Sequence, residues 1–183
     1  MGCFAVIDTE TNWADQVMSI GTIIADSQTF ASLESKYHIL PIECQIGGMY
    51  ENTLFLETPV KPILYTRQEA ILDLTAWFSA HGITDIFAYN ACFDRNHLPE
   101  LRHLVWHDIM RLAAYRQHNP RIPECSECFS TGRMKRGYGV EPMLRLLSGK
   151  NSYQESHNAF FDTLDELEIM RLLGHPIAQY PTL

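Results

Sequence analysis

The order of its apolar segments constrains the fold of this 183-residue chain more than any other feature. Three short apolar runs come first, at Cys3 to Asp8, Met18 to Asp26 and Lys36 to Leu40. Runs of this length, rich in Val and Ile and separated by turn residues, are typical of strands that pair as an antiparallel meander. Gln68 to Ala80 instead repeats apolar residues at helical spacing and ends at Gly82. The chain therefore begins as a sheet and continues with helices.

Strands and helices alternate in the second half. Asp85 to Tyr89 is predicted as a strand, Asn90 as the N-cap of a helix that runs to about Leu98, and Val105 to Ile109 as a short fifth strand. A last helix is expected over residues 158–173, and residues 43–62 are expected to form an irregular connection. This order predicts an α/β fold with a mixed five-stranded sheet, its first three strands antiparallel, flanked by helices.

The length suits a single domain over residues 1–183, with a loop-rich insertion around 118–139. Cys125 and Cys128 in that insertion form the one CxxC pair of the sequence. One pair without a second is weak evidence for zinc, even with His107 or His118 as further ligands, and free thiols are favoured. We therefore expect no structural metal there.

The net charge of −8 is distributed unevenly. Residues 102–150 carry a charge of +5 and the remainder −13. A basic patch on an acidic body fits phosphate attraction, although a solvated surface stretch is the alternative interpretation. No apolar run approaches the roughly 20 residues that cross a bilayer, and the first residues lack a secretory pattern, which predicts a cytoplasmic protein without membrane contact.

Acidic residues stand at three places where elements begin or end. Asp8 and Glu10 close the first strand, and their i, i+2 spacing points both to one face. Two carboxylates so close repel each other unless a cation lies between them. Asp94 falls in the first turn of a helix, and His157 precedes a helix that carries Asp162 one turn inside. Each pattern alone also fits solvated or helix-capping side chains, which is how we interpret Asp165, Glu166 and Glu168.

Taken together and in order, these patterns resemble the DnaQ-like exonucleases of the DEDDh branch, over essentially the whole chain. That family carries Asp-x-Glu, Asn-x-x-aromatic-Asp and His-x-x-x-x-Asp motifs, matched here by Asp8/Glu10, Asn90/Phe93/Asp94 and His157/Asp162. The sister branch has Tyr four residues before the last Asp, where this chain has Asn158. The chain departs from the family in lacking a basic residue after the histidine and in its Asn12-Trp13-Ala14-Asp15 turn.

The resemblance implies a ribonuclease-H-like fold and metal-dependent 3′→5′ hydrolysis of nucleic acid, releasing nucleoside 5′-monophosphates. It implies that Asp8, Glu10, Asp94 and Asp162 hold two Mg²⁺ or Mn²⁺ ions and that His157 is a general base. Asp108 is interpreted as structural. Thr9, Thr11, Asn90 and Phe93 are candidates for contact with the terminal nucleotide. Trp13 is a candidate for stacking on a base, for the core or for a lid. Arg133, Lys135 and Arg136 are candidates for contact with phosphates.

Three alternatives remain open from the sequence. The chain could hold nucleic acid without cutting it, although all five signature residues are present. It could serve as a proofreading or repair subunit with a polymerase partner, or it could be a nuclease of the same general fold that cuts internally. DNA versus RNA preference and a homodimeric state are left undecided, because no motif encodes contacts to a 2′-hydroxyl or an interface.

Overall fold

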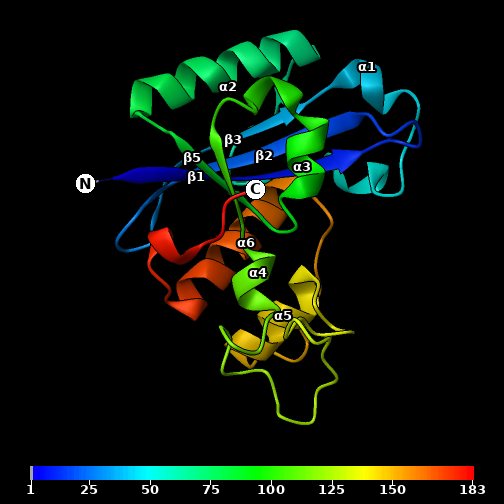
Figure 1. Ribbon diagram of the computed structural model, residues 1–183. Coiled ribbons are helices and arrows are strands. Elements are labelled where there is room, and N and C mark those ends of the chain that lie inside the picture. The colour runs from blue at the N-terminus through cyan, green and yellow to red at the C-terminus, as the bar shows by residue number, and fades with distance from the viewer. Residues whose placement is uncertain (1) are drawn as a thin grey trace.

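The computed structural model describes residues 2–183, which form a mixed sheet with helices on both faces (Figure 1). The sheet has six strands in the order β4-β3-β2-β1-β5-β6. Their bounds are β1 Cys3–Thr11, β2 Val17–Asp26, β3 Ser32–Ile39, β4 Ile63–Leu64, β5 Asp85–Ala88 and β6 Val105–Asp108. Among residues 2–183, no helix is long and apolar enough to cross a membrane.

The first three strands form the predicted antiparallel meander. Strand β1 pairs antiparallel with β2, and β2 with β3, while β4, β5 and β6 join the sheet in parallel pairings. The fold class is therefore confirmed, but the prediction of five strands was wrong. The two-residue strand β4 comes directly after the connection, residues 43–62, that we expected to be irregular, and it pairs in parallel with the end of β3.

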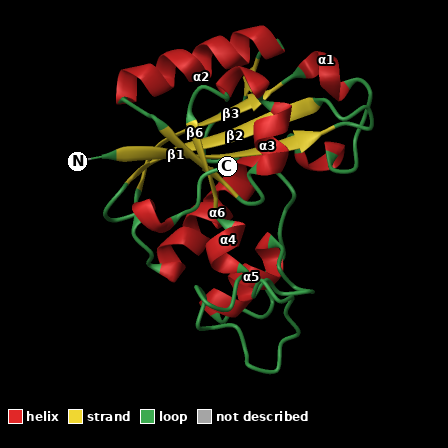
Figure 2. Cartoon of the chain, viewed as in Figure 1, coloured by secondary structure: helices red, strands yellow, loops and turns green. Residues whose placement is uncertain are grey.

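The helices cover the two faces of the sheet unequally (Figure 2). One face is covered by α2, Arg67–His81, which begins with a capping box between Thr66 and Glu69 and ends at Gly82 in the left-handed conformation. The other face carries α4, Met110–Ala113, α5, Val140–Ser148, and α6, Ala159–Leu173. The remaining helices are short: α1 Pro41–Cys44, α3 Cys92–His97, and the 3₁₀ helices η1 Glu51–Thr53, η2 Pro99–Leu101 and η3 Ile177–Gln179.

Alternate side chains of β1 enter the two core layers. Ala5 and Ile7 pack toward α2, whereas Phe4 and Val6 pack toward α5 and α6. Because side chains alternate along a strand, Asp8 and Glu10 continue the Phe4–Val6 row and lie on the α6 side of the sheet. The fold thus places the acidic end of β1 underneath the first turns of α6.

Candidate active site

Asp8 and Glu10 lie in the central strand of the sheet, with their side chains on one face as predicted. Glu10 is 8% exposed and Asp8 is half-buried. Strand β1 has β2 on one side and β5 on the other, so the backbone of Asp8 is held by pairing with Gly21. Both carboxylates are therefore carried by a strand that is paired on both sides.

Gly21 lets α6 approach these carboxylates. It lies opposite Asp8 in the β1–β2 ladder. A Cβ atom built on Gly21 would overlap the carbonyl oxygen of Ala159 and lie 2.6 Å from Oγ1 of Thr163, both in α6. Only a residue without a side chain permits this packing distance. The glycine is thus what brings the first turns of α6, and Asp162 with them, next to Asp8.

Asp94 reaches the same place from α3. It lies in the first turn of this helix and is 1% exposed. The hydroxyl Oγ1 of Thr9 donates a hydrogen bond to Oδ1 of Asp94, at 2.7 Å. The buried side chain of Thr9 therefore orients a carboxylate, which leaves its backbone as the part that can meet a ligand.

Asn90 does not cap α3, so that prediction was wrong. The N-cap is Ala91, without a side-chain cap bond, and Asn90 lies before it in the left-handed region with φ of 62°. Its amide donates to Oδ1 of Asp108, at 3.2 Å. Asp108 also accepts from the amide of Met110, at 3.0 Å, which agrees with the structural role expected of it.

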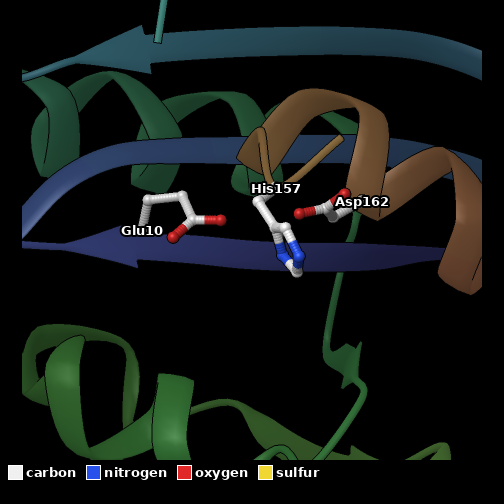
Figure 3. A group of neighbouring side chains, drawn as sticks. All are labelled: Glu10, His157 and Asp162. Carbon is white, nitrogen blue, oxygen red and sulfur yellow. The ribbon is translucent and has the colours of Figure 1, made fainter. Parts of the chain in front are cut away.

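His157 and Asp162 meet Glu10 directly. Single ligand atoms of Glu10, His157 and Asp162 all lie within 4.8 Å of one another. Figure 3 shows the two carboxylates pointing toward each other, one from β1 and one from α6, with the imidazole beside them. These three residues are the one such group of potential metal ligands among residues 2–183.

The loop before α6 holds the imidazole in place. His157 has a left-handed backbone with φ of 51°, and its carbonyl accepts a hydrogen bond from the hydroxyl of Thr53. The ring of Tyr50 stacks on the imidazole, with centroids 4.1 Å apart and planes 15° apart. The segment around η1 therefore fixes both the backbone and the ring of His157.

Asn158 explains one departure from the family pattern. Its side chain is fully buried and accepts from the amides of Phe160 and Phe161, which makes it the N-cap of α6. Its Nδ2 donates to the carbonyl of Thr53 at 2.7 Å and to the hydroxyl of Tyr37 at 3.0 Å. A basic residue here could not be buried and satisfied in this way.

Burial and mutual repulsion hold these carboxyl groups toward their protonated forms. Burial, then the charge of Asp162, raises the pKa of Glu10 to about 9. Burial raises the pKa of Asp162 to about 8 and that of Asp94 to about 7, the latter opposed by the hydrogen bond from Thr9. Burial, then the charge of Asp94, also raises the pKa of Asp8 well above its ordinary value. Cations are the natural compensation for such a cluster.

Two further acids belong to this cluster, and no motif in the sequence predicted either of them. Glu166 is 1% exposed, so its interpretation as a solvated residue was wrong. Its pKa is raised well above the usual range, first by burial and then by Asp94. Glu155 has a raised pKa because of burial. The signal for Glu166 was its i+4 spacing from Asp162, which places both on one face of α6.

The donor set fits divalent cations. Oδ1 of Asp162 and Oε2 of Glu166 are buried and have no hydrogen-bond partner among residues 2–183. Carboxylate oxygens that are buried, unpaired and crowded are the ligands that Mg²⁺ and Mn²⁺ prefer. Asp8, Glu10, Asp94 and Asp162 could hold such ions, and Glu166 is a further oxygen donor beside them.

A cleft opens beside Glu10. Its volume is about 340 Å³, and its lining comes from the end of β1, the turn after it, η1 and α3: Thr9, Glu10, Thr11, Asn12, Trp13, Met49, Tyr50 and Phe93. Trp13 is 67% exposed, which excludes the core role considered for it. Of the four residues expected at the terminal nucleotide, Thr9, Thr11 and Phe93 line this cleft, while Asn90 lies outside its lining.

The cysteine pair and its candidate partners lie apart from this site. Cys125 and Cys128 are free thiols in the long connection between α4 and α5. His107 is committed to structure, since its Nε2 lies 2.7 Å from Asp85 and its Nδ1 lies 2.9 Å from the carbonyl of Tyr180. Both cysteines therefore belong to the connection between α4 and α5, and His107 belongs to the packing of the sheet.

Comparisons with known proteins identify the fold. No protein-family model matches the sequence, and no curated protein matches it. Among solved structures, the nuclease domain of 3′hExo, a DEDDh family member bound to rAMP, is 11% identical with a TM-score of 0.66, over 99% of this chain and 96% of that one. The E. coli ExoI–ssDNA complex is 17% identical with a TM-score of 0.58, over 98% of this chain.

This chain spans only 42% of the ExoI chain. A 3′-exonuclease that recognises the histone mRNA stem-loop is 11% identical with a TM-score of 0.63, over 99% of this chain and 70% of that one. Similarity at such identities is a similarity of fold, and it covers nearly all of this chain. The protein has the ribonuclease-H-like fold of the DEDDh 3′-exonucleases.

Proposed function

We propose that this protein is a divalent-metal-dependent 3′→5′ exonuclease that releases nucleoside 5′-monophosphates from the 3′ ends of nucleic acid. One observation carries the proposal. Four carboxylates from three elements far apart in sequence gather at one place: Asp8, Glu10, Asp94 and Asp162. Their charges raise the pKa of Asp8 and Glu10, and ligand atoms of Glu10 and Asp162 lie within 4.8 Å of one in His157. A fold gains no stability from gathering unpaired carboxylates, so the arrangement favours function.

In this proposal the four carboxylates would hold two cations, and Asp8 is the one whose pKa is raised by the charges of all the other three. When bound, such ions offset the charge of the phosphodiester and assist both the attacking and the leaving oxygen. The work of the chain itself is to fix the positions of these ligands. Strand β1 supplies two of them, and Thr9 orients Asp94 through its 2.7 Å hydrogen bond. The close packing of α6 on Gly21 sets how near Asp162 comes to the sheet.

His157 is the proposed general base. One of its ring nitrogens lies within 4.8 Å of carboxylate oxygens of Glu10 and Asp162, so it faces the place where the scissile phosphate would bind. The unprotonated nitrogen of a neutral imidazole can accept a proton from the attacking water there. The stacked ring of Tyr50 covers one face of the imidazole and limits its rotation. Proton transfer therefore occurs at a nitrogen whose position is set in advance.

The cleft beside Glu10 is the proposed site of the 3′-terminal nucleotide. Trp13, Tyr50 and Phe93 give its walls aromatic surfaces, and Thr9 and Thr11 give it backbone groups. Aromatic rings grip any base by stacking, which gives affinity without base identity. The turn that carries Trp13 is well ordered, because Oδ1 of Asn12 accepts from the amides of Ala14 and Gln16, both at 2.9 Å.

The deciding experiment uses a 5′-labelled oligonucleotide, incubated with Mg²⁺ or Mn²⁺ and, separately, with EDTA. We expect a ladder that shortens one nucleotide at a time from the 3′ end, nucleoside 5′-monophosphate as product, and no reaction in EDTA. Asp162→Asn should fold and be inactive, because the substitution keeps the shape of the side chain and removes a ligand charge. Glu168→Gln, which changes a half-buried acid of the same helix that is ion-paired with Arg171, is the matched control.

Other results point to other functions. Cleavage of a circular strand would replace the proposal with an endonuclease. Retention of the labelled strand without shortening, in the presence of either cation, would replace it with a binding protein. The assay is run on DNA and RNA strands in parallel, because contacts to a 2′-hydroxyl decide that preference.

A further inference from the structure

The long connection between α4 and α5 is an ordered arm that the proposed reaction does not use. This basic arm, residues 115–139, extends away from the sheet beside α5 (Figure 1). Three of its segments are joined by backbone hydrogen bonds: Arg116 to Gly132 at 3.0 Å, Phe129 to Arg133 at 2.8 Å, and Lys135 to Glu127 at 2.9 Å. The arm is thus a folded structure that presents its side chains in fixed positions.

The arm is anchored to the domain at its base. Asn119 is fully buried, and its Nδ2 donates to the carbonyl of Ala113 at 2.7 Å. Ile122 is 5% exposed, and the amide of Met134 donates to the carbonyl of Ala114 at 2.9 Å. The guanidinium of Arg116 donates to carbonyl oxygens within the arm, so this arginine is structural.

The remaining cations of the arm are available to a ligand. The arm carries five Lys and Arg against two acids, a net charge of +3, while the rest of the chain carries −11. Arg121, Arg133 and Arg136 have no ion-pair partner within 4.0 Å among residues 2–183. Lys135 reaches Glu127 only at 4.0 Å and is 44% exposed. A positive protrusion on an acidic body concentrates polyanions at that place.

Aromatic rings are interleaved with these cations. The guanidinium carbon of Arg133 lies 5.0 Å from the ring centroid of Phe129 and 5.2 Å from that of Tyr138. Phe129 is 45% exposed and Tyr138 is 38% exposed. Cations held beside exposed rings are typical of surfaces that bind single-stranded nucleic acid, where phosphates meet the charges and bases stack on the rings.

The arm leads directly to the candidate active site. The hydroxyl of Tyr89 donates to the carbonyl of Tyr138, at the end of the arm. Tyr89 immediately precedes the Asn90–Asp94 motif, and its backbone amide bonds to Glu166. Tyr89 therefore contacts the end of the arm through its side chain and Glu166 of the carboxylate cluster through its backbone.

We propose that the basic arm binds the single-stranded nucleic acid upstream of the 3′-terminal nucleotide, through Arg133, Lys135 and Arg136 at phosphates and Phe129 and Tyr138 at bases. This inference rests on the proposed function for the direction of the strand. The arm gives the enzyme a grip on long substrates that the cleft beside Glu10 does not provide. Removal of its charges should therefore weaken the binding of long strands more than the binding of short ones.

The first experiment measures binding without hydrolysis. Asp162→Asn protein is titrated with a labelled single strand of about 12 nucleotides in Mg²⁺, over a range of salt concentrations, and fluorescence anisotropy gives the affinity. Arg133→Gln, Lys135→Gln and Arg136→Gln are then added together. If three phosphate contacts are lost, the slope of log affinity against log salt falls by about 2. The matched control replaces Lys61, Arg102 and Arg171 with Gln, which removes the same charge outside the arm.

The second experiment measures the preference for length in the active protein. The ratio of kcat/KM for the long strand to kcat/KM for a dinucleotide should fall about tenfold in the triple variant and stay unchanged in the control. Phe129→Leu keeps an apolar side chain, removes the ring, and should weaken binding of the long strand about fivefold or more. This single exposed substitution tests the surface even if the triple variant folds poorly.

The two proposals fail in different ways. If the native protein hydrolyses nothing and the triple variant still loses its salt-dependent binding, the exonuclease proposal falls and the arm stands. If the native protein hydrolyses strands but triple variant and control share one salt slope and one length ratio, the arm inference is overturned. It is equally overturned if the triple variant changes only self-association, since the arm would then bind the acidic body of a second copy.

Discussion

The stability of the cation-free protein should depend on the charge of Asp162. Burial raises the pKa of this carboxyl from 3.8 to about 8, while its side chain is 4% exposed. At about 1.36 kcal/mol for each pKa unit, the ionised form costs about 6 kcal/mol relative to the protonated form. Because the folded pKa is raised, the stability from this group is fully present below about pH 4 and is lost as the pH rises through about 8.

Asp162→Asn keeps the side chain neutral at every pH and tests this reasoning. In EDTA at pH 4, the native and variant proteins should have similar free energies of unfolding. At pH 9 the variant should be more stable by about 3 kcal/mol, which is about half of the full cost of ionising Asp162. The value is halved because neighbouring carboxyl groups take up protons and so reduce the repulsion that Asp162 meets. Urea denaturation at pH 4, 7 and 9 measures the difference, with Glu168→Gln as the control for removal of a half-buried acid on the same helix, outside the cluster.

Addition of Mn²⁺ or Mg²⁺ should reverse the order of stability. The native protein binds cations through ionised carboxylates, so it gains stability at pH 9 by mass action, whereas Asp162→Asn gains less. An Asp162→Asn protein that is no more stable than the native protein in EDTA at pH 9 would refute the electrostatic account. Catalytic loss in this variant, combined with a gain in cation-free stability, would mark the carboxylate as retained for function.

Three further results are expected from single substitutions. Gly21→Ala should destabilise the fold by about 3 kcal/mol in urea denaturation and abolish activity, because a Cβ atom there overlaps α6, whereas Gly139→Ala meets nothing closer than 3.9 Å and should be nearly neutral. Thr9→Val removes the hydrogen bond that lowers the pKa of Asp94, so the acid limb of the pH dependence of Mn²⁺ binding, followed by calorimetry, should move to higher pH. Tyr50→Ala should lower kcat about two- to tenfold and also raise KM, because the ring both stacks on His157 and lines the cleft. Tyr50→Phe keeps the ring and should retain the native rate; equal loss in both variants would contradict the stacking role.

Much of the fold could be predicted from the sequence because its elements have strong local signals. The predicted helix at 68–80 is α2, bounded by the capping box at Thr66 and the glycine at 82, and the three-strand meander has the apolar runs expected of buried strands. Strand β4 could not be predicted, since a two-residue strand has no period to detect. It forms because the edge of β3 offers free backbone groups.

The left-handed backbone of Asn90 depended on a contact distant in sequence. The Ala-Tyr-Asn-Ala sequence favours an N-cap at Asn90 by local chemistry. The amide of Asn90 instead donates to Asp108, eighteen positions later, and this bond turns the chain before α3 begins. Local rules cannot anticipate a conformation that a residue of a different strand imposes.

The candidate site likewise contains residues that sequence motifs could predict and one, Glu166, that they could not. The motifs predicted Asp8, Glu10, Asp94, His157 and Asp162 as site residues, because chemistry at a metal site restricts both residue type and spacing. Glu166 escaped because acids on helices are usually solvated, so its i+4 relation to Asp162 carried little weight before the fold was known. What places it inside is the packing of α6 against β2 at Gly21, a relation between distant segments.

The position of His157 depends on the segment around η1, which is not part of any of the three motifs. Thr53 bonds to the carbonyl of His157 and accepts from Asn158, and Tyr50 stacks on the imidazole, so three contacts from one short segment hold the proposed base. The same segment carries Met49 into the wall of the cleft. A ligand that packs against Met49 and Tyr50 would therefore also restrain His157. Occupancy of the cleft and alignment of the base are in this way coupled through one segment, so His157 is best aligned when the terminal nucleotide is seated in the cleft.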